Sequence, residues 1–108
     1  MQLLTDEIKN NLPPLYSTEN TSTNDKKVVC KFFNPIGAGT WYVVEGEEQE
    51  DGDWLFFGLV KILESEWGYF SLRELEIIEL VNFGLGIERD INFQDNDITI
   101  GNLEIANL

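Results

Sequence analysis

Six carboxylates within nine residues are the side chains of this sequence that are best able to do chemistry. The segment contains no lysine or arginine, and its acids are Glu45, Glu47, Glu48, Glu50, Asp51 and Asp53. Side chains on one face of a strand stand about 6.6 Å apart, and neighbouring strands lie about 4.8 Å apart. Acidic strands can therefore approach the charge spacing of nucleic acid, which is one negative charge per about 1.7 Å of duplex axis.

This acidic segment predicts a surface that a DNA-binding protein could accept in place of its nucleic acid. Glu64 and Glu66, which lie in a second acidic turn, are expected to contribute to the same surface. The partner would be a basic nucleic-acid-binding protein, and the association would be fast and sensitive to salt. The other interpretation is an ordinary solvated hairpin tip, because clustered like charge is typical of solvent-facing loops.

Carboxylates also bind hard divalent cations such as Ca²⁺ and Mg²⁺. Glu88 and Asp90 lie two positions apart in a predicted strand, so they would share a face and could supply two ligands. Residues 45–53 do not follow the ligand spacing of an EF-hand loop. A small metal-binding module or metal-dependent enzyme is therefore the alternative function, and no other cofactor is expected.

Several catalytic classes are excluded by composition. The chain has no histidine, which removes Ser-His-Asp and Cys-His catalysis and histidine-based metal sites. Cys30 is the only cysteine, and its strand-like surroundings are typical of a small buried hydrophobic side chain. We identify no catalytic residue, and the chain is expected not to be an enzyme.

The excess negative charge is confined to the second part of the chain. Residues 1–44 carry four acids and four bases, whereas residues 45–108 carry sixteen acids and three bases and account for the net charge of −13. Such a surface repels phosphate, so direct nucleic-acid binding is not expected. Only Lys26, Lys27 and Lys31 could face a phosphate backbone.

No apolar run approaches the roughly 20 residues that are needed to cross a bilayer. The first residues also lack the basic and apolar stretches of a signal peptide. We therefore expect a cytoplasmic protein that does not bind membranes, and the sequence does not indicate its oligomeric state.

The elements that must position these side chains can be predicted from local patterns. A short helix is expected over residues 5–12, with Thr5 as its N-cap, and Pro13 and Pro14 end it. Strands are predicted at residues 27–33, 40–45, 53–62 and 67–70. Their short connections favour an antiparallel meander.

The strand at 53–62 carries apolar side chains on both faces. This pattern indicates a central strand that is covered on both sides. The alternative is an exposed aromatic face that serves as a docking surface.

Ser71 and Glu74 form a capping box that opens a helix over residues 71–80. Its apolar residues at helical spacing are Leu72, Leu75, Ile78 or Ile77, and Leu80.

The last two elements are less regular. Residues 87–93 alternate like a strand, with Arg89 on the apolar face, where it must reach water or pair with a carboxylate. Residues 97–105 predict a terminal hairpin or edge strand around Gly101 and Asn102.

Together these elements predict an α+β fold in one domain over residues 1–108. The sheet would be antiparallel with four to six strands, and the short N-terminal helix and the helix at 71–80 would pack on one face.

An ordered series of motifs resembles a small bacterial family that is known only as a domain of unknown function. The motifs are LPPLYSTE at 12–19, KFFNP at 31–35, TWYV at 40–43, WLFFG at 54–58, GYFSL followed by ELE at 68–76, and GIERD at 86–90. The resemblance spans about residues 3–93 and leaves residues 94–108 as an extension.

Members of that family are common on plasmids, conjugative elements and phages. The resemblance therefore implies a protein of a mobile genetic element, and it carries no catalytic residues. Proteins of such elements often counter host defence, so an anti-CRISPR or anti-restriction role is a hypothesis by association. The target would be a CRISPR or restriction nuclease whose DNA-accepting surface is basic.

Overall fold

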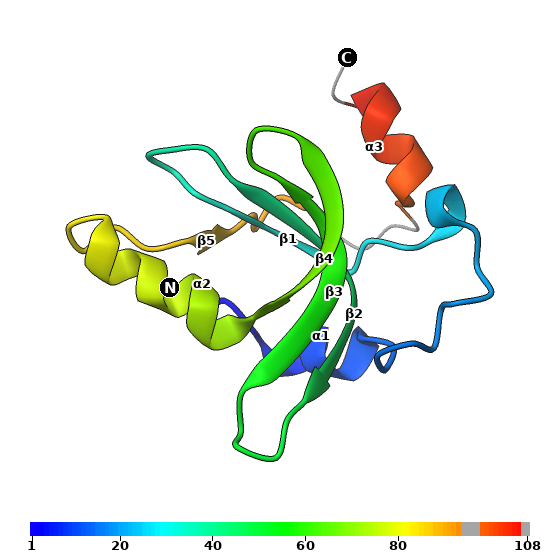
Figure 1. The fold of residues 1–108 in the computed structure, drawn as a ribbon, viewed down its shortest axis with the longest axis horizontal. Coiled ribbons are helices and arrows are strands. Elements are labelled where there is room, and N and C mark those ends of the chain that lie inside the picture. The colour runs from blue at the N-terminus through cyan, green and yellow to red at the C-terminus, as the bar shows by residue number, and fades with distance from the viewer. Residues whose placement is uncertain (94–97, 107–108) are drawn as a thin grey trace.

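A computed structural model describes residues 1–93 and 98–106 as a single α+β domain, which confirms the predicted fold class (Figure 1). Its helices are α1 (Asp6–Asn11), α2 (Leu72–Val81) and α3 (Ile100–Ala106), together with the 3₁₀ turn η1 (Thr23–Asp25). Its strands are β1 (Cys30–Phe33), β2 (Thr40–Glu48), β3 (Trp54–Lys61), β4 (Ser65–Ser71) and β5 (Glu88–Arg89). They form one antiparallel sheet in the order β4-β3-β2-β1-β5.

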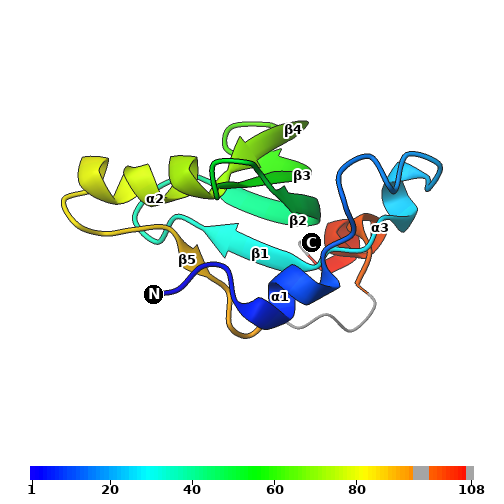
Figure 2. The same ribbon diagram turned by 90° about the horizontal axis from the view of Figure 1, so that it is seen from below.

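The first face of the sheet carries the larger part of the core. Phe56 is fully buried between Phe32 and Phe70, with ring centroids 5.9 Å and 5.6 Å away. This face is covered by Leu12, by the segment before α1 and by Leu75 of α2. Figure 2 shows α1 lying below β1 on this side of the sheet.

The second face is covered by the C-terminal helix. Ile100 and Leu103 of α3 pack with Val28, Tyr42 and Val44. The aromatic and aliphatic side chains of β3 on this side, Leu55, Phe57 and Leu59, are half-buried. The structure therefore confirms that β3 is a central strand with covering on both faces.

A bulge in β2 decides which face receives its acidic residue. Val43 pairs with Gly58, but the next pair is Glu45 with Phe57, so Val44 is the extra residue. Because paired residues share a face, Glu45 lies on the second face with Phe57 instead of on the first face with Val43. Gly58 allows the close approach here, because an added Cβ would lie 1.9 Å from the Tyr42 carbonyl oxygen.

Two helix caps that the sequence predicts are confirmed. The Thr5 hydroxyl accepts a hydrogen bond from the backbone N–H of Ile8, and the Ser71 hydroxyl accepts one from Glu74. Leu80, which helical spacing grouped with Leu72, Leu75 and Ile78, does not lie on their buried side of α2, because it is 82% exposed. Only Leu75 is fully buried, with Leu72 and Ile78 packed beside it.

The prediction of a terminal hairpin is wrong, and that of an edge strand holds only at Thr99, which forms an isolated antiparallel bridge with Lys27. Residues 100–106 form α3, and Thr99 and Asn102 hydrogen-bond each other through side chain and backbone at its start. The Gly101-Asn102 pair therefore belongs to a helix start and not to a β-turn. Asp97, the first residue of the predicted segment, lies outside the described residues.

The strand predicted at 87–93 is also shorter than expected. β5 ends at Arg89, because the Asp90 carboxylate accepts from the N–H of Asn92 and its carbonyl accepts from Phe93, which closes a turn. The guanidinium of Arg89 was expected to reach water or a carboxylate, but it hydrogen-bonds to backbone carbonyl groups instead. Its Nη1 donates to the carbonyl oxygens of Gln2 and Leu3, at 2.6 Å and 3.3 Å.

Among the described residues, the structure contains no helix with the length and apolar character that a membrane span requires.

α2 and α3 lie at opposite ends of the molecule in both views (Figures 1 and 2).

Candidate functional site

The acidic segment spans the end of β2, up to Glu48, and the tip of the β2–β3 hairpin, which projects beyond the sheet (Figure 1). The N–H of Gln49 donates to the Asp53 carbonyl at 2.7 Å, and the N–H of Gly52 donates to the Gln49 carbonyl at 3.0 Å. Gly52 has φ +87°, a conformation that glycine adopts without steric cost. Glu48 and Glu50 are exposed on this ordered turn, so their carboxylates are available to a partner.

The two aspartates of the tip attach it to α2. Arg73 donates from Nη1 to Asp51 Oδ2 at 3.1 Å and from Nη2 to the Asp51 carbonyl at 2.8 Å. Asp53 Oδ1 accepts from the backbone N–H groups of Trp54 and Arg73. Asp51 and Asp53 therefore organise the tip, and the charge of Asp51 is paired.

Glu45 does not join the exposed acids. It is 2% exposed, and its carboxylate accepts hydrogen bonds from the N–H of Tyr16 at 2.8 Å and the N–H of Thr18 at 3.1 Å. It also accepts from the Thr18 hydroxyl. Glu47, two residues further along β2, is exposed, and its carboxylate accepts a hydrogen bond from the N–H of Leu15 at 3.2 Å.

Lys26 completes this internal network. Its ammonium donates to the carbonyl and the hydroxyl oxygens of Thr18, and the residue is only 9% exposed. The Thr18 hydroxyl therefore links a buried cation to the buried Glu45 carboxylate. The arrangement holds residues 15–18 against the second face, with Tyr16 at φ +69°. The sequence signal for it was an acid directly after the apolar run of β2.

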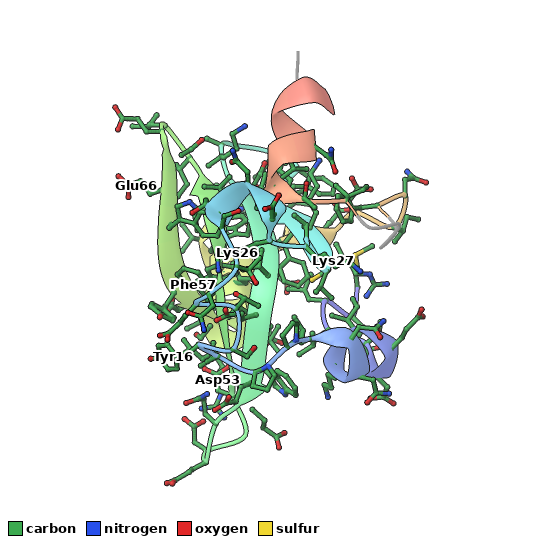
Figure 3. The ribbon with its side chains drawn as sticks, turned by 90° about the vertical axis from the view of Figure 1, so that its right-hand side faces the viewer. Tyr16, Lys26, Lys27, Asp53, Phe57 and Glu66 are labelled. Carbon is green, nitrogen blue, oxygen red and sulfur yellow. The ribbon has the colours of Figure 1, made fainter. Side chains whose placement is uncertain are left out.

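Glu64 and Glu66 are exposed, but the structure does not bring them to the hairpin tip. Glu64 lies in the turn after β3, and Glu66 pairs with Val60 near that same end of β3. The eight residues of β3 span about 23 Å at 3.3 Å per step. Figure 3 shows Glu66 at one end of the strands and Asp53 at the other. The predicted acidic surface is therefore two separate groups.

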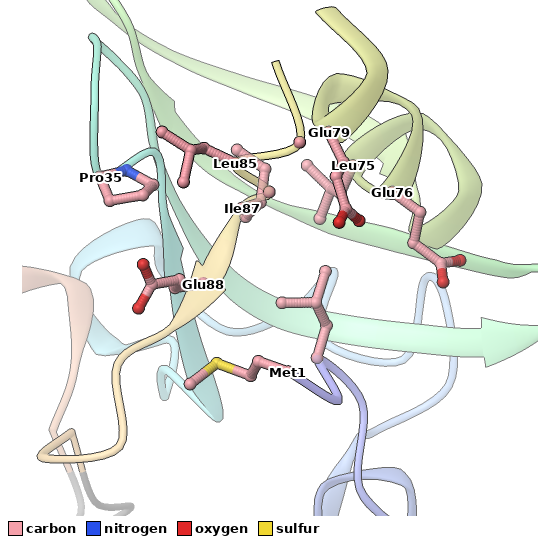
Figure 4. Close-up of a pocket in the computed structure, with 11 residues that line it drawn as sticks. Met1, Pro35, Leu75, Glu76, Glu79, Leu85, Ile87 and Glu88 are labelled. Carbon is pink, nitrogen blue, oxygen red and sulfur yellow. The ribbon is translucent and has the colours of Figure 1, made fainter. Parts of the chain in front are cut away.

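Glu88 and Asp90, which were proposed as metal ligands, contact different parts of the structure. Asp90 Oδ2 lies 3.6 Å from Lys31 Nζ. Glu88 instead lines a cleft of about 270 Å³ together with Glu76 and Glu79 of α2 (Figure 4). Within residues 1–93 and 98–106, no three carboxylate or thiol groups are arranged to hold a metal ion.

The lysines expected to face phosphate are used within the fold or lie apart. Lys26 is buried against Thr18, and Lys31 contacts Asp90 and lies 5.7 Å from the Tyr42 ring centroid. Lys27 is exposed, and Figure 3 labels it with Lys26. Of these three lysines only Lys27 is exposed, so they do not present one exposed basic surface.

A row of aromatic rings crosses the second face, and the sequence did not identify it as a unit. Phe57 stacks on Trp67 at 5.4 Å between centroids and contacts Tyr69 at 4.9 Å, and Tyr69 contacts Tyr16 at 6.1 Å. Desolvation, the Tyr16 side chain and the nearby Glu45 and Glu19 carboxylates raise the pKa of Tyr69 above its ordinary value. The row covers β3 and β4, and we assign it to packing.

A family model described as protein of unknown function (DUF2958) matches residues 3–107. The match extends past residue 93, where the resemblance seen in the sequence ended. No curated protein and no solved structure matches the chain.

Proposed function

We propose that this chain, which belongs to the DUF2958 family, is a non-enzymatic interaction protein that binds the basic, nucleic-acid-accepting surface of another protein. Its contact surface is the tip of the β2–β3 hairpin. The target is a host-defence nuclease of the CRISPR or restriction type, and the chain acts for a mobile genetic element. It works in the cytoplasm.

The observation that supports this proposal most directly is the ordered, exposed pair Glu48 and Glu50. Backbone hydrogen bonds and the Arg73–Asp51 contact fix the turn that carries them. A fixed charged tip loses little conformational entropy on binding, which favours association with a rigid basic groove. Desolvated pairs with lysine or arginine of such a groove are charge-assisted hydrogen bonds, which are stronger than neutral ones.

The proposal is also supported by basic side chains that are held by contacts within the chain. Lys26, Lys31 and Arg89 are held by Thr18, by Asp90 and by the carbonyls of Gln2 and Leu3. At the hairpin tip itself, Arg73 is paired with Asp51, and Lys9 lies 5.7 Å from the ring centroid of Trp54, which pairs with Glu48. The net charge of −13 then steers the chain toward positively charged surfaces.

Glu64 and Glu66 are not included in this contact surface. A partner that reaches the hairpin tip would have to extend about 23 Å along β3 to meet them. Glu45 is excluded too, because its carboxylate is buried and hydrogen-bonded within the chain.

The metal-dependent alternative has less support. Asp90 is paired with Lys31, and Glu88 faces the cleft beside α2 instead of facing Asp90. A melting temperature that rises on addition of Ca²⁺ or Mg²⁺ and falls with chelator would favour this alternative.

The proposal is tested by competition with DNA. Labelled DNA is bound to a purified guide-loaded CRISPR nuclease and, in parallel, to a restriction endonuclease, and the chain is then titrated in at several salt concentrations. We expect DNA to be displaced from at least one class of enzyme, with an affinity that falls as salt rises. Retention of DNA on every enzyme, or displacement that is independent of salt, would contradict the proposal.

A further inference from the structure

The outward face of α2 carries an apolar stripe that no described part of the chain covers. At 100° per residue, Ile77, Leu80 and Val81 fall on the side opposite the buried Leu75. Leu80 is 82% and Val81 73% exposed, and Phe83 directly after the helix is 97% exposed. Contiguous apolar patches beyond a few hundred Å² are rare on monomers and usually mark a contact surface. We call Ile77, Leu80, Val81 and Phe83 the α2 stripe.

The backbone at Phe83 gives independent support. The N–H of Gly84 donates to the carbonyl of Glu79 at 2.9 Å, which ends α2 with a Schellman-type turn. Phe83 occupies the left-handed position of this turn, with φ +57°, where glycine is the usual residue. A phenylalanine there costs about 1 kcal/mol and gains no burial, so the fold itself does not explain it.

Acids border the stripe on both sides, and Arg73, which shares its face at the start of α2, is paired with Asp51 of the hairpin tip. Glu74 lies on one flank, and Glu76 and Glu79 lie on the other. The last two also line the cleft with Glu88, and its wall includes the apolar side chains of Leu85 and Ile87 (Figure 4). A lysine or arginine can lay its methylene stem on such a wall while its charged group reaches the carboxylates.

From this arrangement we infer that the α2 stripe binds an amphipathic, basic helix of a partner protein. The apolar seam of that helix packs on Leu80, Val81 and Phe83, and its flanking lysines or arginines pair with Glu74 on one side and with Glu76 and Glu79 on the other. Helix pairs of this kind obtain affinity from the apolar seam and orientation from the flanking charges. The stripe lies toward the end of α2, whereas the hairpin tip contacts Arg73 at its start, and the inference does not depend on the function proposed for the tip.

A second copy of this chain fits the stripe less well. Two copies would bring the same glutamates together along the flanks, and each carries a net charge of −13. Like-charge juxtaposition across an interface is unfavourable, whereas a basic helix supplies the complementary sign.

The test uses two synthetic leucine–lysine peptides of identical composition. One peptide has its leucines in helical amphipathic order, and the other has the order scrambled so that only the charge is kept. At physiological ionic strength we expect the amphipathic peptide to bind at least about tenfold more tightly than the scrambled one. Equal affinities would mean that the chain attracts basic peptides by charge alone, and would overturn the inference.

The matched variants locate the site. The double variant Leu80→Ser, Phe83→Ser should lose the preference for the amphipathic peptide, whereas Leu63→Ser, which alters a 94% exposed leucine in the β3–β4 turn, should keep it. The variant Glu48→Gln, Glu50→Gln should also keep it. An unchanged preference in the double variant would overturn the inference. So would sedimentation of the wild-type chain as a dimer that this variant dissociates, because the occupant would then be a second copy.

Discussion

The carboxylate of Glu45 and the side chain and N–H of Thr18 are hydrogen-bonded partners, although they lie 27 positions apart in the chain. Thr18 in turn accepts from the ammonium of Lys26. The most acidic strand of the protein therefore uses one of its acids to anchor the loop before η1, and only the following acids face solvent.

Removal of this carboxylate should destabilise the fold. Glu45→Ala leaves the partly buried N–H groups of Tyr16 and Thr18 without their acceptor and the buried ammonium of Lys26 without the nearby carboxylate, so we expect the free energy of unfolding to fall by about 2–4 kcal/mol. Urea denaturation measures the change. Glu48→Ala, three residues along the same strand but exposed, is the control and should stay within about 0.5 kcal/mol. Similar losses in the two variants would show that Glu45 is not a structural acid.

The bulge in β2 depends on the absence of a side chain at Gly58. A Cβ there would lie 1.9 Å from the Tyr42 carbonyl oxygen, so Gly58→Ala should force β2 and β3 apart and cost about 3 kcal/mol or more. Gly68 pairs directly with Gly58, and a Cβ on it would meet nothing within 4 Å. Gly68→Ala is therefore a matched control, which thermal unfolding should show to be close to wild type. The account of the bulge fails if the two substitutions cost the same.

Cys30 should make the stability sensitive to alkaline pH. Burial raises the pKa of its thiol to about 12 from 9.0, partly offset by the charge of Arg89. Between these values the unfolded chain loses the proton and the folded chain keeps it. The contribution of the protonated thiol to the free energy of unfolding is thus fully present below pH 9. It is lost as the pH rises toward 12, by up to about 1.4 kcal/mol per pH unit.

Because lysines and tyrosines also titrate in this window, the measurement is a comparison. Wild type and Cys30→Ala are unfolded by urea at a series of pH values from neutral to strongly alkaline. The variant should be less stable at neutral pH, but its stability should fall less steeply above pH 9. Parallel pH profiles would indicate that the thiol is not held protonated by the fold.

Phe83 should show opposite effects on stability and on binding. Phe83→Gly relieves the left-handed backbone conformation, so we expect an increase of up to about 1 kcal/mol in the free energy of unfolding. The same variant should bind the amphipathic basic peptide less tightly than wild type does. A loss of stability would mean instead that the ring supports the fold.

The sequence predicts elements well where the signal is local. The N-caps at Thr5 and Ser71 and the alternation in β3 depend on neighbouring residues, and the structure confirms them. α3 was missed because Gly101 and Asn102 also form turns, and the contact that decides between the two is the one between Thr99 and Asn102.

The surface was less predictable because it depends on contacts between distant residues. The burial of Glu45 requires both the Val44 bulge and the loop around Thr18, and an acid directly after the apolar run of β2 does not by itself predict either of them. The separation of Glu66 from the hairpin tip follows from the length of β3. For α2, helical spacing alone does not show which of two apolar sets faces inward, and Leu80 lies outside.

The central claim is that the Glu48–Glu50 tip, and not the total charge of the chain, binds a basic nucleic-acid-accepting surface. Two variants with the same loss of charge test it directly: Glu48→Gln, Glu50→Gln at the tip, and Glu64→Gln, Glu66→Gln at the other end of β3. The experiment uses a nuclease from which the wild-type chain displaces DNA. The measured quantity is the inhibition constant with which each variant blocks DNA binding by that nuclease. We predict that the tip variant weakens inhibition by about tenfold and that the other variant stays within about twofold of wild type. Equal weakening by the two variants would contradict the claim.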